Sequence, residues 1–348
     1  MKAVYIEEHG GPEALIYGDL PEPKIESLEV KLRVKACALN RLDLYTRAGV
    51  RGTRRKSTDP FILGCDVAGE IVDIGDGVTT AALGDRVVVD PIITCGQCSN
   101  CLSGKNALCS GKRSMLGATV NGGYAEFMKV PAVNVFKIPD NITYEEAASL
   151  PTTFMPVWRI VVQQGQLQPW ETVLVLSASS GVGTAAIQVA KNVVGARVIA
   201  TTSNREKAIK AKQLGADEVI IYTEESVGEK VKELTDGRGV NLVVDHVGTD
   251  FWEDAYSSLS IGGRYGVCGV TTGYQAQLHL GMLFSKQLTV FGVFMASKQD
   301  LREIIGSLQR GQITGTVSKT FSLQEASEAH KAMEDRNFFG KLVLSIPD

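Results

Sequence analysis

The chain has 348 residues, 44% of them apolar, and its 36 basic and 39 acidic side chains give a net charge of −3. This length is enough for two domains with large cores. Without a basic excess, the composition argues against nucleic acid or an anionic membrane as a partner, and no apolar run is long enough to span a bilayer.

The first 150 residues predict an irregular, β-rich domain. The opening segment, MKAVYIEEHGG, has the pattern of a strand and a turn rather than of a signal peptide, so we expect a cytoplasmic protein. Gly and Pro separate the strand-like runs, which are Met1–Glu7, Glu29–Ala36, Gly69–Ile74 and Arg86–Val89. Residues Glu145–Val162 have the pattern of a helix. They lead into a middle region in which strands and helices alternate.

Four of the seven cysteines lie close together in the segment TCGQCSNCLSGKNALC. Their spacing is C-x2-C-x2-C-x7-C, and they are Cys95, Cys98, Cys101 and Cys109. Four thiolates at this spacing predict one structural zinc ion per chain, which would brace a lobe of about residues 91–113. Two alternatives remain: disulfides, which are rare in cytoplasmic proteins, and an iron–sulfur cluster, whose usual spacing and proline the segment lacks. Because four protein ligands leave no open position, we expect an architectural role.

Residues 172–202 have the pattern of a strand, a tight turn, a helix and a second strand. Val173–Leu176 and Arg197–Thr201 predict the strands, and residues 182–194 predict the helix. The turn consists of small residues, which are Ala178, Ser179, Ser180, Gly181, Val182 and Gly183. Such a unit directs backbone N–H groups and the positive end of a helix to one point, which suits a diphosphate. The turn matches the G-x-G-x-x-G pattern only as A-x-S-x-x-G, so an ordinary α/β turn is the alternative.

Strand-like and helical segments alternate along the rest of this region. The expected strands are Asp217–Tyr222, Val240–Asp245, Arg264–Val267 and Leu288–Phe294, and the expected helices are Arg205–Leu214, Glu224–Leu234 and Phe251–Leu259. They predict an α/β fold in which residues 151–296 form a doubly wound, six-stranded parallel sheet. Two further helices, Lys298–Gln309 and Leu323–Met333, and a strand, Lys341–Ile346, are expected to return to the first domain. That domain then comprises residues 1–150 and 297–348.

The end of the second strand of this sheet bears on the choice of cofactor. NAD-binding sheets usually place an acid there for the ribose 2′-hydroxyl. Here the side chains are hydroxyl or cationic donors, namely Thr202, Ser203, Arg205 and Lys207. Such donors suit a 2′-phosphate, so we expect NADP(H) rather than NAD(H); the alternative is that Arg205 and Lys207 are only the solvated start of a helix. His246 and Gly269 are further candidate cofactor contacts near the carboxyl ends of strands. The alternative for His246 is a turn histidine whose hydrogen bonds are all made within the protein.

Several segments together resemble the medium-chain dehydrogenase/reductase superfamily, between its zinc alcohol dehydrogenases and its quinone oxidoreductases. They are MKAV at the start, ALNRLD at 38–43, LGCDVAGEIVDIG at 63–75, GDRV at 84–87, GGYAEF at 122–127, VVDHVG at 243–248 and FGKLVL at 339–344. The resemblance covers essentially the whole chain. It implies an N-terminal, partly open β-barrel of the GroES-like type, a Rossmann domain, and an active site in the cleft between them.

The same resemblance implies that the usual catalytic zinc ligands are missing. The first Cys ligand of zinc alcohol dehydrogenases falls at Asn40, their His ligand at Cys65, the Glu beside that His at Asp66, and their last Cys ligand at about Thr152. Asn and Thr are poor zinc ligands, and a lone Cys such as Cys65 is commonly a small buried thiol. By resemblance, Asn40 would line the nicotinamide end of the cleft and donate to a substrate oxygen, with Thr152 within reach of the same space. Asp43 is expected to cap the helix after Asn40.

These inferences predict an NADP(H)-dependent oxidoreductase that transfers hydride to or from a carbonyl, a quinone or an activated alkene without a catalytic zinc. Two alternatives remain: a zinc-dependent alcohol dehydrogenase with an atypical metal site, and a nucleotide-binding protein without turnover. We expect a small-molecule substrate. Because Leu288–Phe294 would be an outer strand that can pair with its twofold mate, we also expect a homodimer or homotetramer.

Overall fold

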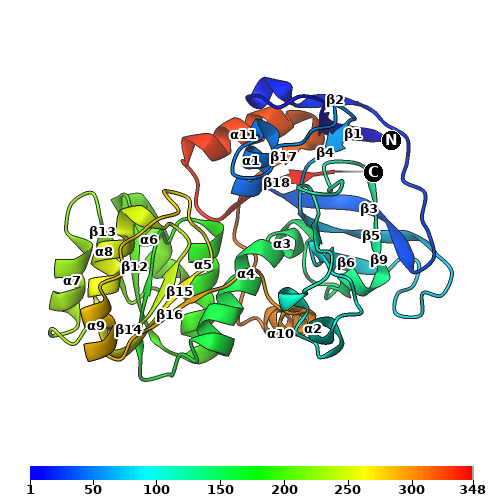
Figure 1. Ribbon diagram of the computed structural model, residues 1–348. Coiled ribbons are helices and arrows are strands. Elements are labelled where there is room, and N and C mark those ends of the chain that lie inside the picture. Colours follow the sequence, from blue (N-terminus) through cyan, green and yellow to red (C-terminus); the bar gives the residue numbers. More distant parts are fainter. Residues whose placement is uncertain (347–348) are drawn as a thin grey trace. The chain divides into compact units, whose positions relative to one another are not determined.

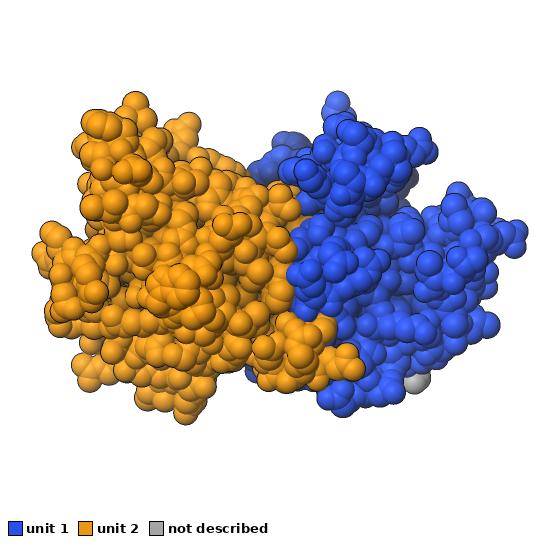
Figure 2. Space-filling view, turned by 90° about the horizontal axis from the view of Figure 1, so that it is seen from below, with its two compact units in different colours: residues 1–152, 297–305, 315–348 blue, residues 153–296, 306–314 orange. Residues whose placement is uncertain are grey.

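The computed structural model describes residues 1–346, and the chain divides into two compact units. Unit 1 comprises residues 1–152, 297–305 and 315–348, and unit 2 comprises residues 153–296 and 306–314 (Figure 2). The sequence predicts that all residues after 296 return to the first domain, but residues 306–314 pack with unit 2. One reason is that Thr314 N donates to Gln188 Oε1 at 2.8 Å. No helix among the described residues is long and apolar enough to cross a membrane.

Unit 2 is built on a parallel sheet, most of whose strands are labelled in Figure 1. The sheet has six strands in the order β13-β12-β11-β14-β15-β16. The strands are β11 (Thr172–Val175), β12 (Arg197–Thr202), β13 (Glu218–Ile221), β14 (Val240–Asp245), β15 (Leu259–Val267) and β16 (Thr289–Gly292). The segments between them contain α5 (Gly181–Gln188), the π-helical η5 (Val189–Val194), α6 (Arg205–Leu214), α7 (Val227–Leu234), α8 (Thr249–Ser257) and α9 (Leu280–Ser285). In chain order the strands run 3-2-1-4-5-6, which is the doubly wound order that the sequence predicts. The order reverses beside β11, so the carboxyl ends of β11, β12 and β14 lie together at the edge where such sheets bind ligands.

The helical stretch that the sequence predicts over residues 145–162 is divided into three segments. They are α3 (Tyr144–Ala148), α4 (Pro151–Trp158) and the π-helical η4 (Arg159–Gln164). The break precedes Pro151, because proline disfavours helical backbone at the residue before it. Another predicted helix, Phe251–Leu259, ends earlier than expected because Leu259 already opens β15.

Unit 1 is rich in antiparallel strands, as the sequence predicts for this region. Its largest sheet has seven strands in the order β10-β6-β5-β3-β18-β17, with β9 paired to β3, and a second sheet has the order β2-β1-β4. The strands are β1 (Lys2–Ile6), β2 (Ile16–Asp19), β3 (Glu29–Ala38), β4 (Phe61–Ile62), β5 (Asp66–Ile74), β6 (Arg86–Val89), β7 (Ile92–Ile93), β8 (Ser114–Met115), β9 (Phe127–Pro131), β10 (Val135–Lys137), β17 (Val317–Ser322) and β18 (Lys341–Ser345). The helical segments are η1 (Pro12–Ala14), α1 (Arg41–Ala48), α2 (Ser99–Leu102), η2 (Asn106–Leu108), η3 (Ala132–Asn134), η6 (Leu323–Glu325), α11 (Ala326–Asp335) and most of α10 (Lys298–Gln309), whose residues 306–309 belong to unit 2.

The last strand, β18, lies between β3 and β17 in this sheet. It runs parallel to β17 and antiparallel to β3, with Val343 opposite Ala38. Continued by two residues, this register brings Lys341 level with Asn40. Residues three hundred positions apart in the sequence therefore become neighbours through strand pairing.

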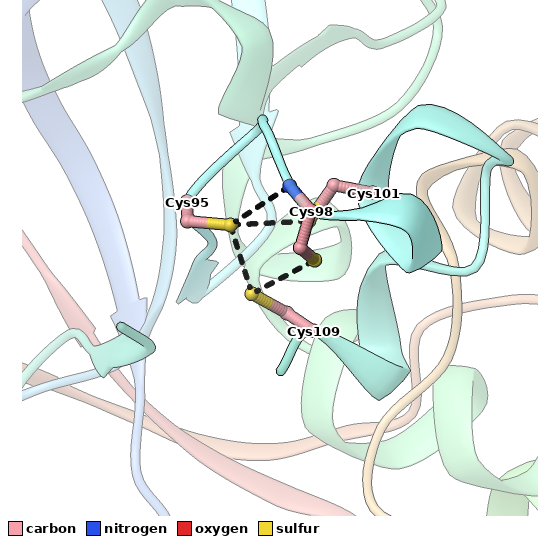
Figure 3. Close-up of side chains that lie close together, drawn as sticks. All are labelled: Cys95, Cys98, Cys101 and Cys109. Atoms are coloured by element: carbon pink, nitrogen blue, oxygen red, sulfur yellow. Dashed lines mark hydrogen bonds between the residues drawn. The ribbon is translucent and has the colours of Figure 1, made fainter. Parts of the chain in front are cut away.

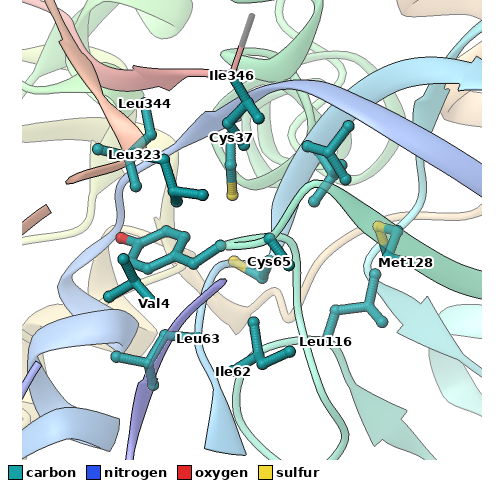
Figure 4. Packing of buried hydrophobic residues seen from close by; sticks show 14 of the residues in the cluster. Val4, Cys37, Ile62, Leu63, Cys65, Leu116, Met128, Leu323, Leu344 and Ile346 are labelled. Atoms are coloured by element: carbon teal, nitrogen blue, oxygen red, sulfur yellow. The ribbon is translucent and has the colours of Figure 1, made fainter. Parts of the chain in front are cut away.

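An apolar cluster fills the interior of unit 1 (Figure 4). It combines residues from the first strands, such as Val4, with residues from the last strand, such as Leu344. Cys37 and Cys65 lie within this cluster and are fully buried. The two cysteines therefore pack as small apolar side chains, and Cys65 adjoins the residues described next.

Candidate active site

The turn that joins β11 to α5 has the geometry that a dinucleotide phosphate site requires. Ser177 has a φ of 53°, which turns the chain sharply after the strand. The Ser180 hydroxyl accepts a hydrogen bond from Gly183 N at 2.9 Å and so caps α5. A Cβ at position 183 would clash with the carbonyl oxygen of Ser177, so helix and strand can approach this closely only with glycine there. The predicted residues 178–183 all lie in this turn and the first turn of the helix.

Two buried polar atoms near the turn have no hydrogen-bond partner among residues 1–346. They are Thr202 Oγ1 at the end of β12 and His246 Nδ1 just after β14. His246 Nε2 lies 2.7 Å from Ser180 Oγ, and a Cβ on Gly269 would lie 2.8 Å from the His246 carbonyl oxygen. Burial lowers the pKa of His246 to about 4, so the ring is neutral and offers one donor and one acceptor. Unpaired atoms at this edge of the sheet are what a bound nucleotide would satisfy, so the residues present fit the expected cofactor.

The side chains that follow β12 include two cations, Arg205 and Lys207. Arg205 opens α6, and its guanidinium lies 3.4 Å from the Glu224 carboxylate in an exposed ion pair. The Asn204 side chain caps α6 by accepting from Lys207 N at 2.9 Å, and burial lowers the pKa of Lys207. Ser203 and Asn204 separate the strand from Arg205, so no carboxylate takes the place of the acid that binds the ribose 2′-hydroxyl in NAD-binding sheets.

The residues that the resemblance aligns with catalytic zinc ligands come together in unit 1. Asn40 Nδ2 donates to Asp66 Oδ2 at 2.9 Å and lies 3.3 Å from both Cys65 Sγ and the carbonyl oxygen of Ala38. Thr152 N donates to Asp66 Oδ1 at 3.1 Å. The Thr152 hydroxyl lies 2.7 Å from Asn40 Oδ1 and also contacts Asp66 Oδ2. These side chains therefore bond to one another. We expected the Asn40 amide to donate to a substrate oxygen, but its hydrogens point to acceptors within the protein.

Sequence reasoning missed one member of this group, Lys341 on β18. Its Nζ lies 2.6 Å from Asn40 Oδ1 and 3.1 Å from Asp66 Oδ2, and the residue is 5% exposed. One feature of the sequence could have identified it: Lys341 opens the apolar run KLVL, which predicts a buried strand, and a buried cation needs a charged or polar partner. We refer to Asn40, Cys65, Asp66, Thr152 and Lys341 as the Asn40 cluster.

Burial shapes the electrostatics around this cluster. Burial raises the pKa of Cys65 well above its usual range, so this residue is a neutral thiol. Asp43 accepts from Asn40 N at 2.7 Å and from Gly64 N at 3.1 Å, which holds the start of α1 against the chain before β5. Burial nevertheless raises the pKa of Asp43 to about 7. Asp43 thus braces the backbone of Asn40, in line with the capping role that we expect.

The four cysteines of the predicted lobe converge around one point (Figure 3). Their sulfur atoms all lie within 4.8 Å of one another, with separations of 3.4 Å for Cys109–Cys95 and 3.9 Å for Cys98–Cys109. A zinc–sulfur bond of about 2.3 Å requires tetrahedral sulfur separations of about 3.8 Å, so the residues present fit a zinc ion. Backbone N–H groups lower the pKa of Cys98 to about 5, which favours the thiolate that metal binding needs. In the described part of the chain, no other group of three or more His, Cys, Asp or Glu side chains could hold a metal ion.

Two family models match the chain. The alcohol dehydrogenase GroES-like domain matches residues 26–140, and the zinc-binding dehydrogenase domain matches residues 181–310. The chain belongs to the medium-chain dehydrogenase/reductase superfamily. The GroES-like domain therefore lies in unit 1 of this dehydrogenase/reductase, and the Rossmann-type sheet of unit 2 completes the fold that the sequence predicts.

Full-length relatives of this dehydrogenase/reductase carry several activities in their names. It is 33% identical to an acryloyl-coenzyme A reductase of Metallosphaera sedula, over 99% of this chain and 100% of the relative. It is 31% identical to an NAD-dependent alcohol dehydrogenase of Sulfolobus acidocaldarius, with the same coverage, and 31% identical to a quinone oxidoreductase of Pseudomonas aeruginosa, over 99% of each chain. All three kinds are NAD(P)-dependent oxidoreductases, and this chain is an enzyme of that class.

Solved structures agree with this assignment. A crystal structure of an NAD-dependent alcohol dehydrogenase is 40% identical, covers 100% of both chains and has a TM-score of 0.95. A cobalt- and zinc-bound alcohol dehydrogenase from Pyrobaculum aerophilum is 29% identical over 99% of both chains, with a TM-score of 0.88. The family therefore includes metal-bound members with the same fold.

Proposed function

We propose that this enzyme is an NADP(H)-dependent oxidoreductase that transfers hydride to or from a carbonyl, quinone or activated alkene without a catalytic metal. The observation that carries the proposal is the Asn40 cluster, in which hydrogen bonds and an ion pair join the side chains that stand at the metal-ligand positions. Asparagine and threonine oxygens are weak zinc ligands, and the buried Cys65 thiol is held neutral. Asp66 already has a cationic partner in Lys341.

The cofactor preference follows from the end of β12. A 2′-phosphate needs hydrogen-bond donors, and β12 does not end in an acidic residue that would repel it. Ser203, Arg205 and Lys207 supply such donors, and the exposed Arg205–Glu224 pair can exchange for a phosphate at little cost because exposed pairs contribute only ~0–1 kcal/mol. NADPH supplies the hydride when bound. The residues of unit 2 hold its diphosphate at the β11–α5 turn, and those of unit 1 shape the polar surroundings of the substrate.

We assign the four lobe cysteines to one structural zinc ion per chain. The ion would hold residues 91–113, which have short elements and little apolar interior of their own. Because the four thiolates complete its coordination, it takes no part in the reaction.

The experiment that tests this proposal is a substrate panel assayed with both cofactors. Purified enzyme is given NADPH or NADH with acryloyl-coenzyme A, a quinone, an enone and an aldehyde, because relatives bear names from these classes. We expect turnover of at least one compound and a kcat/KM at least about 10-fold higher with NADPH. Arg205→Glu should lower the preference for NADPH, whereas Arg238→Glu, at an exposed arginine elsewhere in unit 2, should not. Tight NADPH binding without turnover of any class would favour a nucleotide-binding protein instead.

We also propose that the chain forms a dimer through β16. This strand is the outer strand of its sheet, and apolar side chains beside it are open to solvent, including Phe294 at 60% and Phe284 at 77% exposure. Light scattering should give twice the chain mass or a multiple of it. A monomeric mass at micromolar concentration would contradict the proposal.

A further inference from the structure

We propose that the loop after α1 binds the phosphates of the substrate, and that this substrate is an acyl thioester of coenzyme A. The inference rests on the proposed function, because it narrows the class of carbonyl or activated alkene on which the enzyme acts. The loop comprises residues 49–60, between α1 and β4, and we refer to it as the basic loop. Three of its features support the proposal: its charge, the partners of its side chains and its connection to the Asn40 cluster.

The basic loop concentrates positive charge in a chain whose net charge is −3. In its segment VRGTRRKSTD, the acid Asp59 comes last and is the only one. The Asp59 carboxylate accepts a hydrogen bond from the Ser57 hydroxyl at 2.6 Å, whereas Arg55 Nη1 donates to the carbonyl oxygen of Asp59 at 3.3 Å. One carboxylate therefore stands against four cations, which are Arg51, Arg54, Arg55 and Lys56.

Three of these cations have no carboxylate partner in the described part of the chain. Arg54, Arg55 and Lys56 form no ion pair with any of residues 1–346. Arg54 and Lys56 are exposed, so their charged groups face solvent. Burial lowers the pKa of Arg55, because contacts within the chain do not fully replace the water that its guanidinium loses. A bound anion would supply the charge that this loop lacks.

Stacking on aromatic rings holds two guanidinium groups of the loop in place. The Arg55 guanidinium lies 4.0 Å from the centre of the Phe61 ring, and that of Arg51 lies 4.5 Å from the Tyr45 ring. The backbone is also fixed, because Arg55 N donates to His9 Nε2 at 2.9 Å. Stacking uses the face of a guanidinium and leaves the N–H groups at its edge available. Those of Arg55 make one hydrogen bond within the described chain, so the others can bind phosphate oxygens in pairs.

The basic loop is connected at both ends to members of the Asn40 cluster. Before the loop, α1 has 8 residues and begins directly after Asn40, so the loop starts about 12 Å from Asn40. After the loop, Phe61 lies four residues before Cys65, which limits the distance between them to about 14 Å. An arm of about this length therefore suffices to join a group at the cluster to a group at the loop.

These positions define the kind of substrate. On the proposed function, the reacting carbon lies beside the Asn40 cluster. A simple aldehyde or quinone placed there has no anionic group for the cations of the basic loop. An acyl thioester of coenzyme A has both parts, because its flexible pantetheine arm joins the acyl carbonyl to the phosphates, whose oxygens arginine recognises.

Binding of coenzyme A alone tests the phosphate site independently of the acyl group. In calorimetry, pantetheine, which lacks the phosphates, should bind at least about 10-fold more weakly than coenzyme A. Arg54→Glu/Lys56→Glu should raise the Kd of coenzyme A at least about 10-fold. The control Lys24→Glu/Arg302→Glu makes the same change of charge at exposed positions of other segments, and screening should keep its Kd within about 2-fold of the wild type. No binding of coenzyme A, or equal effects of the two double variants, would overturn the inference.

Kinetics with two thioesters connect this site to the reaction. Acryloyl-coenzyme A and acryloyl-N-acetylcysteamine have the same reacting group, but only the first has phosphates. Arg54→Glu/Lys56→Glu should raise KM for acryloyl-coenzyme A about 10-fold without changing kcat, and should change neither value for the short thioester. Arg55→Lys keeps the charge but loses the planar fork, and should raise the same KM about 3-fold. Equal changes in KM for both thioesters would contradict a role in phosphate binding.

The outcomes distinguish this inference from the proposed function. If the enzyme acts on an aldehyde or a quinone but does not bind coenzyme A, the inference is wrong and the proposed function stands. If Arg54→Glu/Lys56→Glu raises the Kd of NADPH instead of that of coenzyme A, the loop binds phosphates of the cofactor, and the inference is again wrong. If no compound of the substrate panel is turned over, the proposed function is wrong and the inference is overturned with it.

Discussion

The cysteine lobe and the Asn40 cluster hold their polar groups together by different means. The lobe draws four thiols from one short segment, and three of these cysteines are partly exposed. The Asn40 cluster draws its members from distant segments, buries them, and joins them by hydrogen bonds and a lysine–aspartate ion pair. We propose that a bound ion orders the lobe, whereas the polar groups of the cluster bond to one another. On this proposal, one fold uses a bound metal at one site and an internal cation at another.

The largest expected effect comes from breaking the lobe. Cys98→Ser removes one of four ligands, so the zinc content should fall from about one ion per chain to near zero. Residues 91–113 should then become sensitive to limited proteolysis, because the metal holds a segment with little core. Metal analysis and proteolytic mapping provide the measurements. Cys268→Ser, at a cysteine outside the lobe, should keep its zinc; loss of zinc there as well would contradict the assignment.

A second prediction concerns a variant in which the Asn40 cluster is changed into a metal site. The variant Asn40→Cys/Cys65→His/Thr152→Cys/Lys341→Met supplies three good zinc ligands and removes the competing ammonium. It should bind a second zinc ion per chain. The matched triple variant that keeps Lys341 should bind this ion about 10-fold more weakly, because the ammonium repels a divalent cation. Equal zinc affinity in the two variants would contradict this prediction, because it would show that the Lys341 ammonium does not compete with a metal ion bound in the cluster.

The sequence alone identified most of both sites, and the reason differs between them. The lobe is local, so the spacing of Cys95–Cys109 was sufficient to predict it. Asn40, Cys65, Asp66 and Thr152 could be found because each stands in a recognisable motif. Lys341 also stands in a recognised segment, FGKLVL, but its place in the cluster could not be read from that segment, because strand pairing across the sheet places it 3.1 Å from a carboxylate 275 residues away in sequence. The orientation of the Asn40 amide, with its hydrogens turned to protein acceptors, also depends on this contact.

The smallest expected effect concerns thiol reactivity. After the metal is removed, iodoacetamide at neutral pH should label the three partly exposed lobe cysteines, which include Cys98 with its lowered pKa. Cys65 should stay unlabelled in the folded protein, because it is fully buried and its raised pKa keeps it a thiol. Peptide mass spectrometry measures both sites in one sample. Labelling of Cys65 as fast as Cys98 would mean that the cluster is open to solvent.

The zinc content of the wild-type enzyme tests the central claim most directly. Protein purified with zinc present, dialysed and analysed by mass spectrometry for bound metal should contain one zinc ion per chain, and its kcat should not rise when zinc is added. Two ions per chain, with the second lost together with activity, would contradict the claim that Lys341 provides the cation of the Asn40 cluster.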